Sequence, residues 1–120
     1  MVLVVDKNKD LLDCYKEFYS HHGLASMEFT NIPDAYSFFT KNKNIIRLIS
    51  IDLSLQKKFD GLSLARSLKK ISSIPIILIT WSPLPADLED DLFTAILTKP
   101  IDLEQLETLA KLYCLKVPRA

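Results

Sequence analysis

Short apolar runs alternate along the chain with stretches of helical periodicity. The runs cover residues 2–5, 47–53, 74–80 and 95–99, with a weaker one at 24–29. Their length and their content of valine and isoleucine favour strands over helices. The strongest runs leave few polar positions, so we expect strands that are covered on both faces, as in a parallel sheet.

Between the runs, apolar residues recur at the three- and four-residue spacing of amphipathic helices. Asn8, Asn31 and Asp102 are the expected N-caps, and Gly23 is expected just past the end of the first helix. Residues 86–93 have room for roughly two more helical turns before the last strand.

The order of a strand and a helix, repeated five times, predicts a single α/β domain. In such a domain a parallel sheet is covered by helices on both faces. The chain of 120 residues has the usual length of one domain. We expect a core at about residues 1–115, and a tail or linker stub at 116–120.

Composition and charge narrow the classes of partner. Apolar residues make up 48% of the chain, and fifteen basic residues balance fifteen acidic ones. A chain without net charge gives no electrostatic case for binding nucleic acid or a membrane. The apolar runs are too short for a signal peptide or a membrane span. Cys14 and Cys114 lack the spacing of a zinc site and are interpreted as buried free thiols in a reducing cytoplasm.

Polar residues end four of the five predicted strands. They are Asp6, Asp52, Thr80 and Lys99. A parallel sheet brings these ends to one edge, where open α/β sheets bind ligands. Two carboxylates there suit Mg²⁺, and a hydroxyl with an ammonium suits phosphoryl oxygens. The pattern indicates phosphoryl transfer, which depends on positioning and charge. The plain alternative is that Asp52 only ends a strand at a turn.

These motifs resemble those of the response-regulator receiver domains of bacterial two-component signalling, over almost the whole chain. The matching pieces are VVD at 4–6, ISID at 49–52, DGL at 60–62, PIILIT at 75–80 and LTKP at 97–100. The resemblance implies a flavodoxin-like, doubly wound five-stranded parallel sheet, a (βα)5 fold. It also implies a signalling domain and not an enzyme.

The resemblance assigns a role to each residue at the predicted edge. Asp52 would be the phosphoacceptor, taking phosphate from a histidine kinase or a histidine phosphotransfer protein. Asp6 would be an acid of the metal site, Thr80 the switch hydroxyl and Lys99 the lysine that contacts phosphate. Mg²⁺ would be held by Asp6, Asp52 and the backbone of Ser54.

The chain also departs from the family pattern. Lys7 stands where the family has a second acid that binds the metal directly, which puts Mg²⁺ binding in question. Lys7 is therefore a candidate to substitute for the metal; the alternative is that it points to solvent. Trp81 follows Thr80, where the family has a small residue that gives access to the acceptor. The stretch up to Lys99 is short, so the fourth helix should be truncated or irregular.

These observations support an atypical receiver domain of a cytoplasmic phosphorelay, which accepts phosphate on Asp52 weakly or signals without Mg²⁺-dependent phosphorylation. The alternative is a module for protein interaction or dimerisation that does not use phosphorylation. The sequence leaves undecided whether the chain forms a homodimer. Ile96 and the short fourth helix predict that the usual switchable dimer of the family is altered or missing. A nucleotide-binding enzyme is disfavoured, because Gly23 and Gly61 are the only glycines and form no phosphate loop.

Overall fold

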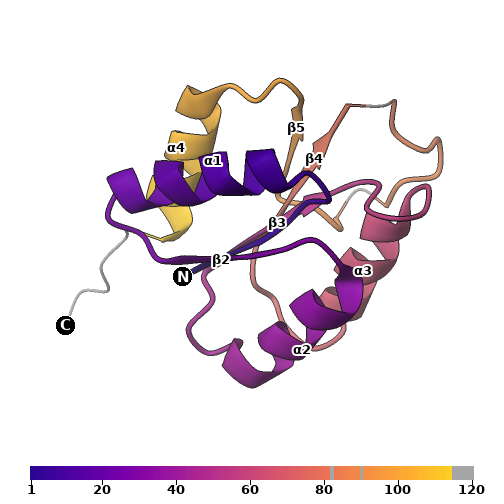
Figure 1. The fold of residues 1–120 in the computed structure, drawn as a ribbon. Helices are drawn as coiled ribbons and strands as arrows, with labels where there is room; N and C mark the ends of the chain where they lie inside the picture. The colour runs from indigo at the N-terminus through magenta and orange to yellow at the C-terminus, as the bar shows by residue number, and fades with distance from the viewer. Residues whose placement is uncertain (82, 90, 115–120) are drawn as a thin grey trace.

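One parallel sheet organises the molecule, with its strands in the order β2-β1-β3-β4-β5 (Figure 1). The computed structural model describes residues 1–81, 83–89 and 91–114. The strands are β1 (Val2–Val5), β2 (Ser26–Phe29), β3 (Leu48–Asp52), β4 (Ile76–Thr80) and β5 (Ala95–Thr98). The helices are α1 (Lys9–His21), α2 (Ile32–Asn42), α3 (Asp60–Lys69) and α4 (Leu103–Tyr113). The predicted doubly wound, five-stranded α/β fold is confirmed.

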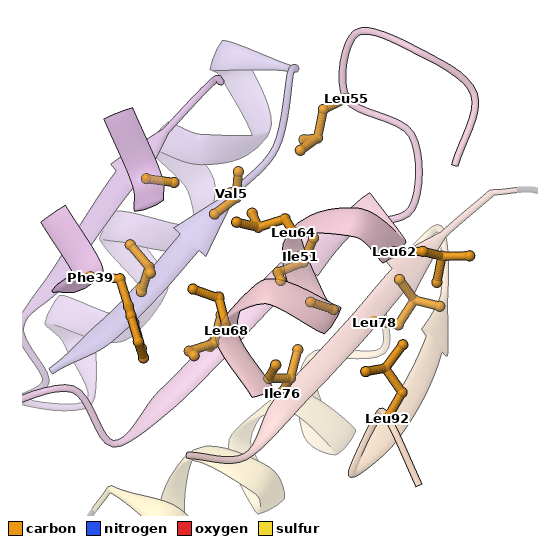
Figure 2. Close-up of a cluster of buried hydrophobic side chains, with 14 of the residues drawn as sticks. Val5, Phe39, Ile51, Leu55, Leu62, Leu64, Leu68, Ile76, Leu78 and Leu92 are labelled. Atoms are coloured by element: carbon orange, nitrogen blue, oxygen red, sulfur yellow. The ribbon is translucent and has the colours of Figure 1, made fainter. Parts of the chain in front are cut away.

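Helices cover both faces of the sheet, with α1 and α4 on one side and α2 and α3 on the other (Figure 1). The alternation of side chains along a strand explains how one sheet serves both layers. In β1, Val2 and Val4 belong to the apolar cluster under α1 and α4. Leu3 and Val5 belong to the cluster under α2 and α3, which Figure 2 shows around Phe39 and Leu68.

The strand order places the crevice of the sheet between β1 and β3. The chain leaves β1 towards β2 on one side and reaches β3 on the other, so this is the point where the winding reverses. Val5 pairs in register with Ile51. The next residue of each strand is an acid, so Asp6 and Asp52 emerge side by side.

Local signals in the sequence define the helix ends. Asn8, Asn31 and Asp102 each accept a hydrogen bond from a backbone N–H in the first helical turn, as the capping prediction required. Gly23 follows α1 with a φ of +75°, a conformation that glycine adopts without strain. No helix in the part of the chain that the structure describes is long and apolar enough to span a membrane.

The connection between β4 and β5 differs from the prediction of two helical turns at 86–93. Residues 83–89 and 91–94 contain turns and no helix. The apolar side chain of Leu92 packs into the core cluster under α3 instead. The single Nε–H of Arg66 is shared between the two carboxylate oxygens of Glu89, at 3.1 Å from each, and Nη2 of Arg66 donates to Oε1 of Glu89 at 2.6 Å. These bonds tie the loop to α3.

The interpretation of the cysteines as buried thiols is wrong for Cys14, which is exposed on α1. The helix turns Leu12, Tyr15 and Tyr19 towards the sheet, and Cys14 lies off this stripe. Cys114 is half-buried after α4, and its burial raises the pKa of its thiol.

Candidate functional site

The structure brings the four predicted site residues to one edge of the sheet. Asp6, Asp52, Thr80 and Lys99 are all buried, and they are the buried polar residues found at the carboxyl ends of β1, β3, β4 and β5. The parallel arrangement of these neighbouring strands is sufficient to place their ends together. The predicted grouping is therefore present in the fold.

Lys99 bridges the two acids of this cluster. Its Nζ atom donates hydrogen bonds to Oδ2 of Asp6 at 3.0 Å and to Oδ2 of Asp52 at 3.2 Å. The backbone N–H of Lys99 also donates to the carbonyl oxygen of Thr80 at 2.8 Å, which fixes the start of the side chain. The Lys99–Pro100 peptide bond that follows is cis. One buried ammonium thus forms charge-assisted hydrogen bonds with two carboxylates.

The second oxygen of each acid is held by its own loop. Oδ1 of Asp6 accepts a hydrogen bond of 2.8 Å from the backbone N–H of Asn8. Oδ1 of Asp52 accepts one from the backbone N–H of Ser54 at 3.5 Å. A bond of 3.5 Å lies at the long end of the range and is weak. Oδ1 of Asp52 is therefore less restrained than Oδ1 of Asp6.

The electrostatics of the cluster make ionisation of Asp52 less favourable than that of a free aspartate. Burial raises the pKa of Asp52, the neighbouring Asp6 raises it further, and the ammonium of Lys99 opposes both effects. When both acids are ionised, one positive charge faces two negative ones. The cluster then lacks one compensating charge in an environment that solvates ions poorly.

Lys7 is exposed and is not brought into the cluster. Within residues 1–81, 83–89 and 91–114 it forms no ion pair with Asp6 or Asp52. Lys7 stands at a bend just beyond the end of β1. This placement agrees with the alternative hypothesis that Lys7 points to solvent. The amine that lies between the acids is that of Lys99.

The side chains at this edge fit a divalent ion only in part. The described residues contain no group of three or more His, Cys, Asp or Glu side chains that could hold a metal. Mg²⁺ can bind through one or two carboxylates and keep several waters, so Asp6 and Asp52 are usable ligands. In this structure the ammonium of Lys99 lies between them. The predicted third ligand, the backbone of Ser54, stays a prediction.

Asp60 holds the loop after β3, a role that the sequence analysis missed. Its carboxylate accepts backbone hydrogen bonds from Leu55 at 2.6 Å and from Gln56 and Lys57 at 3.0 Å each. Burial favours a higher pKa for Asp60, but these three donors prevail and lower it. The signal was available, because an acid at the start of a helix often binds backbone N–H groups of the preceding loop.

Trp81 and Tyr15 flank the cluster on the side of α1. Trp81 follows β4 with 68% of its surface exposed, and Nζ of Lys99 lies 5.9 Å from the centre of its ring. Tyr15 is buried, and its hydroxyl has no hydrogen-bond partner in the described structure. The apolar periodicity of α1 accounts for the burial of Tyr15 but not for its unpartnered hydroxyl.

Comparison with known proteins agrees with this geometry. The family model described as "Response regulator receiver domain" matches residues 2–111. No curated protein matches the chain.

Solved structures show the same fold. A two-component response regulator from Clostridium difficile superposes with a TM-score of 0.82 at 23% identity, over 92% of each chain. A CheY-like response regulator receiver domain from Methylobacillus flagellatus gives a TM-score of 0.77 at 22% identity, over 92% of this chain and 94% of its own. At these identities the likeness establishes the arrangement of the elements and leaves the chemistry to the residues of the site.

Proposed function

Because the chain belongs to the response regulator receiver domain family, we propose that it is an atypical receiver that accepts a phosphoryl group on Asp52, weakly, in a cytoplasmic phosphorelay. The observation that carries the proposal is the buried pair of Asp52 and Lys99, with Nζ and Oδ2 at 3.2 Å. Thr80 ends the neighbouring strand, so a hydroxyl also belongs to this edge.

The proposed reaction is a direct transfer between two side chains. An oxygen of Asp52 forms a bond to the phosphorus of a phosphohistidine. The phosphorus–nitrogen bond breaks, and its electron pair leaves with the imidazole of the donor. The product is an acyl phosphate on Asp52. Lys99 supplies positive charge to the phosphoryl oxygens, the kind of stabilisation on which this chemistry depends.

The same geometry supports slow transfer. The ammonium of Lys99 is shared with Asp6 at 3.0 Å, so it must redistribute its hydrogen bonds when a phosphoryl group arrives. Its single charge would then have to neutralise two carboxylates and the phosphoryl oxygens. Oδ1 of Asp52, with only a 3.5 Å hydrogen bond to Ser54, is the oxygen best placed to attack.

The partner in this proposal is a protein that presents a phosphohistidine, namely a histidine kinase or a histidine phosphotransfer protein. The domain is the acceptor of the group and not an enzyme with its own turnover. Balanced charge in the chain as a whole, with fifteen basic and fifteen acidic residues, supports recognition of a protein and not of nucleic acid.

Intact-mass spectrometry tests the proposal. The protein is incubated with acetyl phosphate, with and without Mg²⁺, beside an Asp52→Asn control. We expect a slow, partial gain of one phosphoryl group in the wild type and none in the control. A wild type that never gains the group, or a control that gains it equally, would overturn Asp52 as the acceptor.

The second candidate is an interaction module that does not use phosphorylation. The observation in its favour is the apolar surface beside the acids, where Trp81 is 68% exposed and Leu103 is 55% exposed. The edge strand β5 also leaves Ile96 40% exposed, which would suit a homodimer. Sedimentation velocity over a range of concentrations tests whether the domain forms a homodimer. A dimer through β5 should be weakened by Ile96→Lys.

A further inference from the structure

A cavity of about 320 Å³ lies beside the acid cluster, between α1 and the segments that follow β4 and β5. Its lining includes Tyr15 and Phe18 of α1, Trp81, Lys99, and Leu103 at the start of α4. Most of these side chains are apolar, and no carboxylate is among the described residues that line it. The volume lies at the lower end of the range of roughly 300–1,000 Å³ found for small-molecule sites.

Tyr15 is one of the residues that line this cavity, and its hydroxyl is a polar group with an unused hydrogen bond. It is buried and has no hydrogen-bond partner within the described part of the chain, whereas buried hydroxyls are almost always bonded. Burial, followed by the charges of Asp6 and Asp52, raises the pKa of Tyr15. The phenol therefore keeps its proton and can donate it to an acceptor.

The charges near the cavity select an uncharged ligand. Lys99 lines the cavity, but its ammonium already bonds to Asp6 and Asp52. An anion would lie close to two carboxylates that share one cation. A cation would compete with Lys99 and pay the cost of leaving water for apolar walls.

Aromatic side chains on two sides of the cavity favour a flat ligand. Phe18 of α1 and Trp81 after β4 both line it, and rings of this kind pack well against other planar groups. Because Trp81 is 68% exposed, covering it with a ligand would also remove a large apolar surface from water.

We propose that this cavity binds one uncharged, planar aromatic small molecule that carries a hydrogen-bond acceptor for the hydroxyl of Tyr15. The cavity adjoins the phosphoryl-transfer cluster through Lys99, whereas Asp52 does not line it. The apolar walls supply affinity, and the phenol fixes the orientation of the ligand. A side chain or helix of a protein partner is the competing occupant.

The neutral naphthalene ketone Prodan is a suitable probe, because its emission shifts to the blue in apolar surroundings and its carbonyl accepts a hydrogen bond. We expect saturable binding to the wild type with one site per chain. Leu103→Asp places a charge in the cavity wall and should weaken binding about tenfold or more. Leu112→Asp is the matched control, because Leu112 lies on the same helix with 52% exposure, against 55% for Leu103.

Two tyrosines separate a specific hydrogen bond from loose apolar adsorption. Tyr19 is buried with an unpartnered hydroxyl, like Tyr15, but it does not line the cavity. Tyr15→Phe should weaken Prodan binding roughly two- to tenfold, the range of one hydrogen bond. Tyr19→Phe should leave binding unchanged, and circular dichroism checks that both variants fold.

The outcomes are distinct. Non-saturable binding, or equal binding by the two leucine variants, would overturn the proposal and leave the apolar wall to a protein partner. Equal affinity of Tyr15→Phe and the wild type would overturn the assigned hydrogen bond. Prodan binding is measured without any phosphodonor, so failure of the phosphoacceptor proposal leaves this result unaffected, and the reverse also holds.

Discussion

Nζ of Lys99 lies 3.2 Å from Oδ2 of Asp52, so the carboxylate that we propose as the phosphoacceptor is already paired with a buried cation in the resting domain. The same ammonium contacts Asp6 at 3.0 Å. The side chains of Asp6, Asp52 and Lys99 form a single electrostatic unit. In the resting site, the ammonium of Lys99 is shared between the two carboxylates. Substitutions in this unit therefore change stability and chemistry together.

Removing the bridging cation should destabilise the domain. In Lys99→Met, Asp6 and Asp52 keep their burial but lose the ammonium between them. Removing one partner of a buried ion pair costs about 3–5 kcal/mol, and we expect a loss of this size in the free energy of unfolding at pH 7. Urea denaturation followed by circular dichroism measures it.

Two variants make this measurement specific to the bridge. Lys7→Met removes an exposed lysine from the loop after β1 and should change stability by less than about 0.5 kcal/mol. The double variant Lys99→Met/Asp52→Asn should recover part of the loss, because it removes one of the unpaired carboxylates. Equal effects of Lys99→Met and Lys7→Met would contradict the bridging role.

Asp52→Asn alone should raise stability at neutral pH. Burial and Asp6 hold the pKa of Asp52 above its usual value, so ionisation is less favourable in the folded state than in the unfolded chain. This penalty is present above the folded pKa and disappears below the unfolded value of about 3.9. The stabilisation of Asp52→Asn over the wild type should therefore shrink as the pH falls from 7 to 3.

A series of urea denaturation curves across this pH range tests the sign. A wild type that is more stable than Asp52→Asn at pH 7 would show that the hydrogen bond from Lys99 outweighs the burial and repulsion of the carboxylate.

The position of α3 against Asp52 depends on Gly61. A Cβ atom at this residue would lie 2.1 Å from the backbone oxygen of Asp52 and 2.9 Å from that of Leu53. Backbone atoms of a central strand cannot move aside cheaply, so Gly61→Ala should cost about 3 kcal/mol. Gly23→Ala is the control: it has open space around it and a φ of +75°, and its backbone strain should cost about 1 kcal/mol.

Thermal unfolding of the two alanine variants gives the comparison. If Gly61→Ala melts no lower than Gly23→Ala, the close approach of α3 to β3 does not constrain the loop that carries Ser54.

The sequence was sufficient to predict the sheet and the residues at its edge, because both depend on strong, short-range patterns. Apolar runs such as residues 76–80 define strands by themselves, and parallel pairing then places Asp6 and Asp52 together. The contacts within the cluster were harder to predict from the sequence. Lys7 is adjacent to Asp6 in sequence, whereas Lys99 reaches Asp6 across 93 positions. Only the three-dimensional position of β5 reveals which lysine is the partner.

The loop at residues 83–89 and 91–94 is a part of the fold that the sequence did not predict. Its apolar residues have helical spacing, but Leu92 is buried in the core cluster under α3 as part of an irregular segment. Contacts with the rest of the molecule, such as that between Arg66 and Glu89, decide its path. Local patterns carry no information about such partners, and tertiary contacts override helix propensity.

The loop after β1 offers a test of whether this site can regain a metal. Lys7→Asp exchanges the exposed lysine next to Asp6 for a carboxylate, which places a third acid in the loop at this edge and removes a positive charge from that loop. Mg²⁺ prefers hard oxygen ligands and commonly binds through carboxylates and waters. We expect Lys7→Asp to bind Mg²⁺ with millimolar affinity, and the wild type to show no saturable binding.

Trp81 reports this change directly. Its ring centre lies 5.9 Å from Nζ of Lys99, so an ion that displaces the ammonium from Asp6 and Asp52 alters the surroundings of the only tryptophan in the chain. Fluorescence should change along a saturable curve in Lys7→Asp, and the change should disappear in Lys7→Asp/Asp52→Asn. Calcium chloride and sodium chloride titrations at equal ionic strength separate ion binding from general screening.

The wild type provides the decisive comparison for Lys7. Saturable Mg²⁺ binding by the wild type, lost in Asp52→Asn, would mean that two carboxylates suffice and that neither Lys7 nor the bridging Lys99 excludes the ion. Binding by Lys7→Asp alone would mean that the charge at this one exposed position separates a metal-dependent receiver from this chain. The cost of placing a third carboxylate at the edge is then offset by the ion, because a divalent cation relieves the repulsion that one ammonium leaves uncompensated.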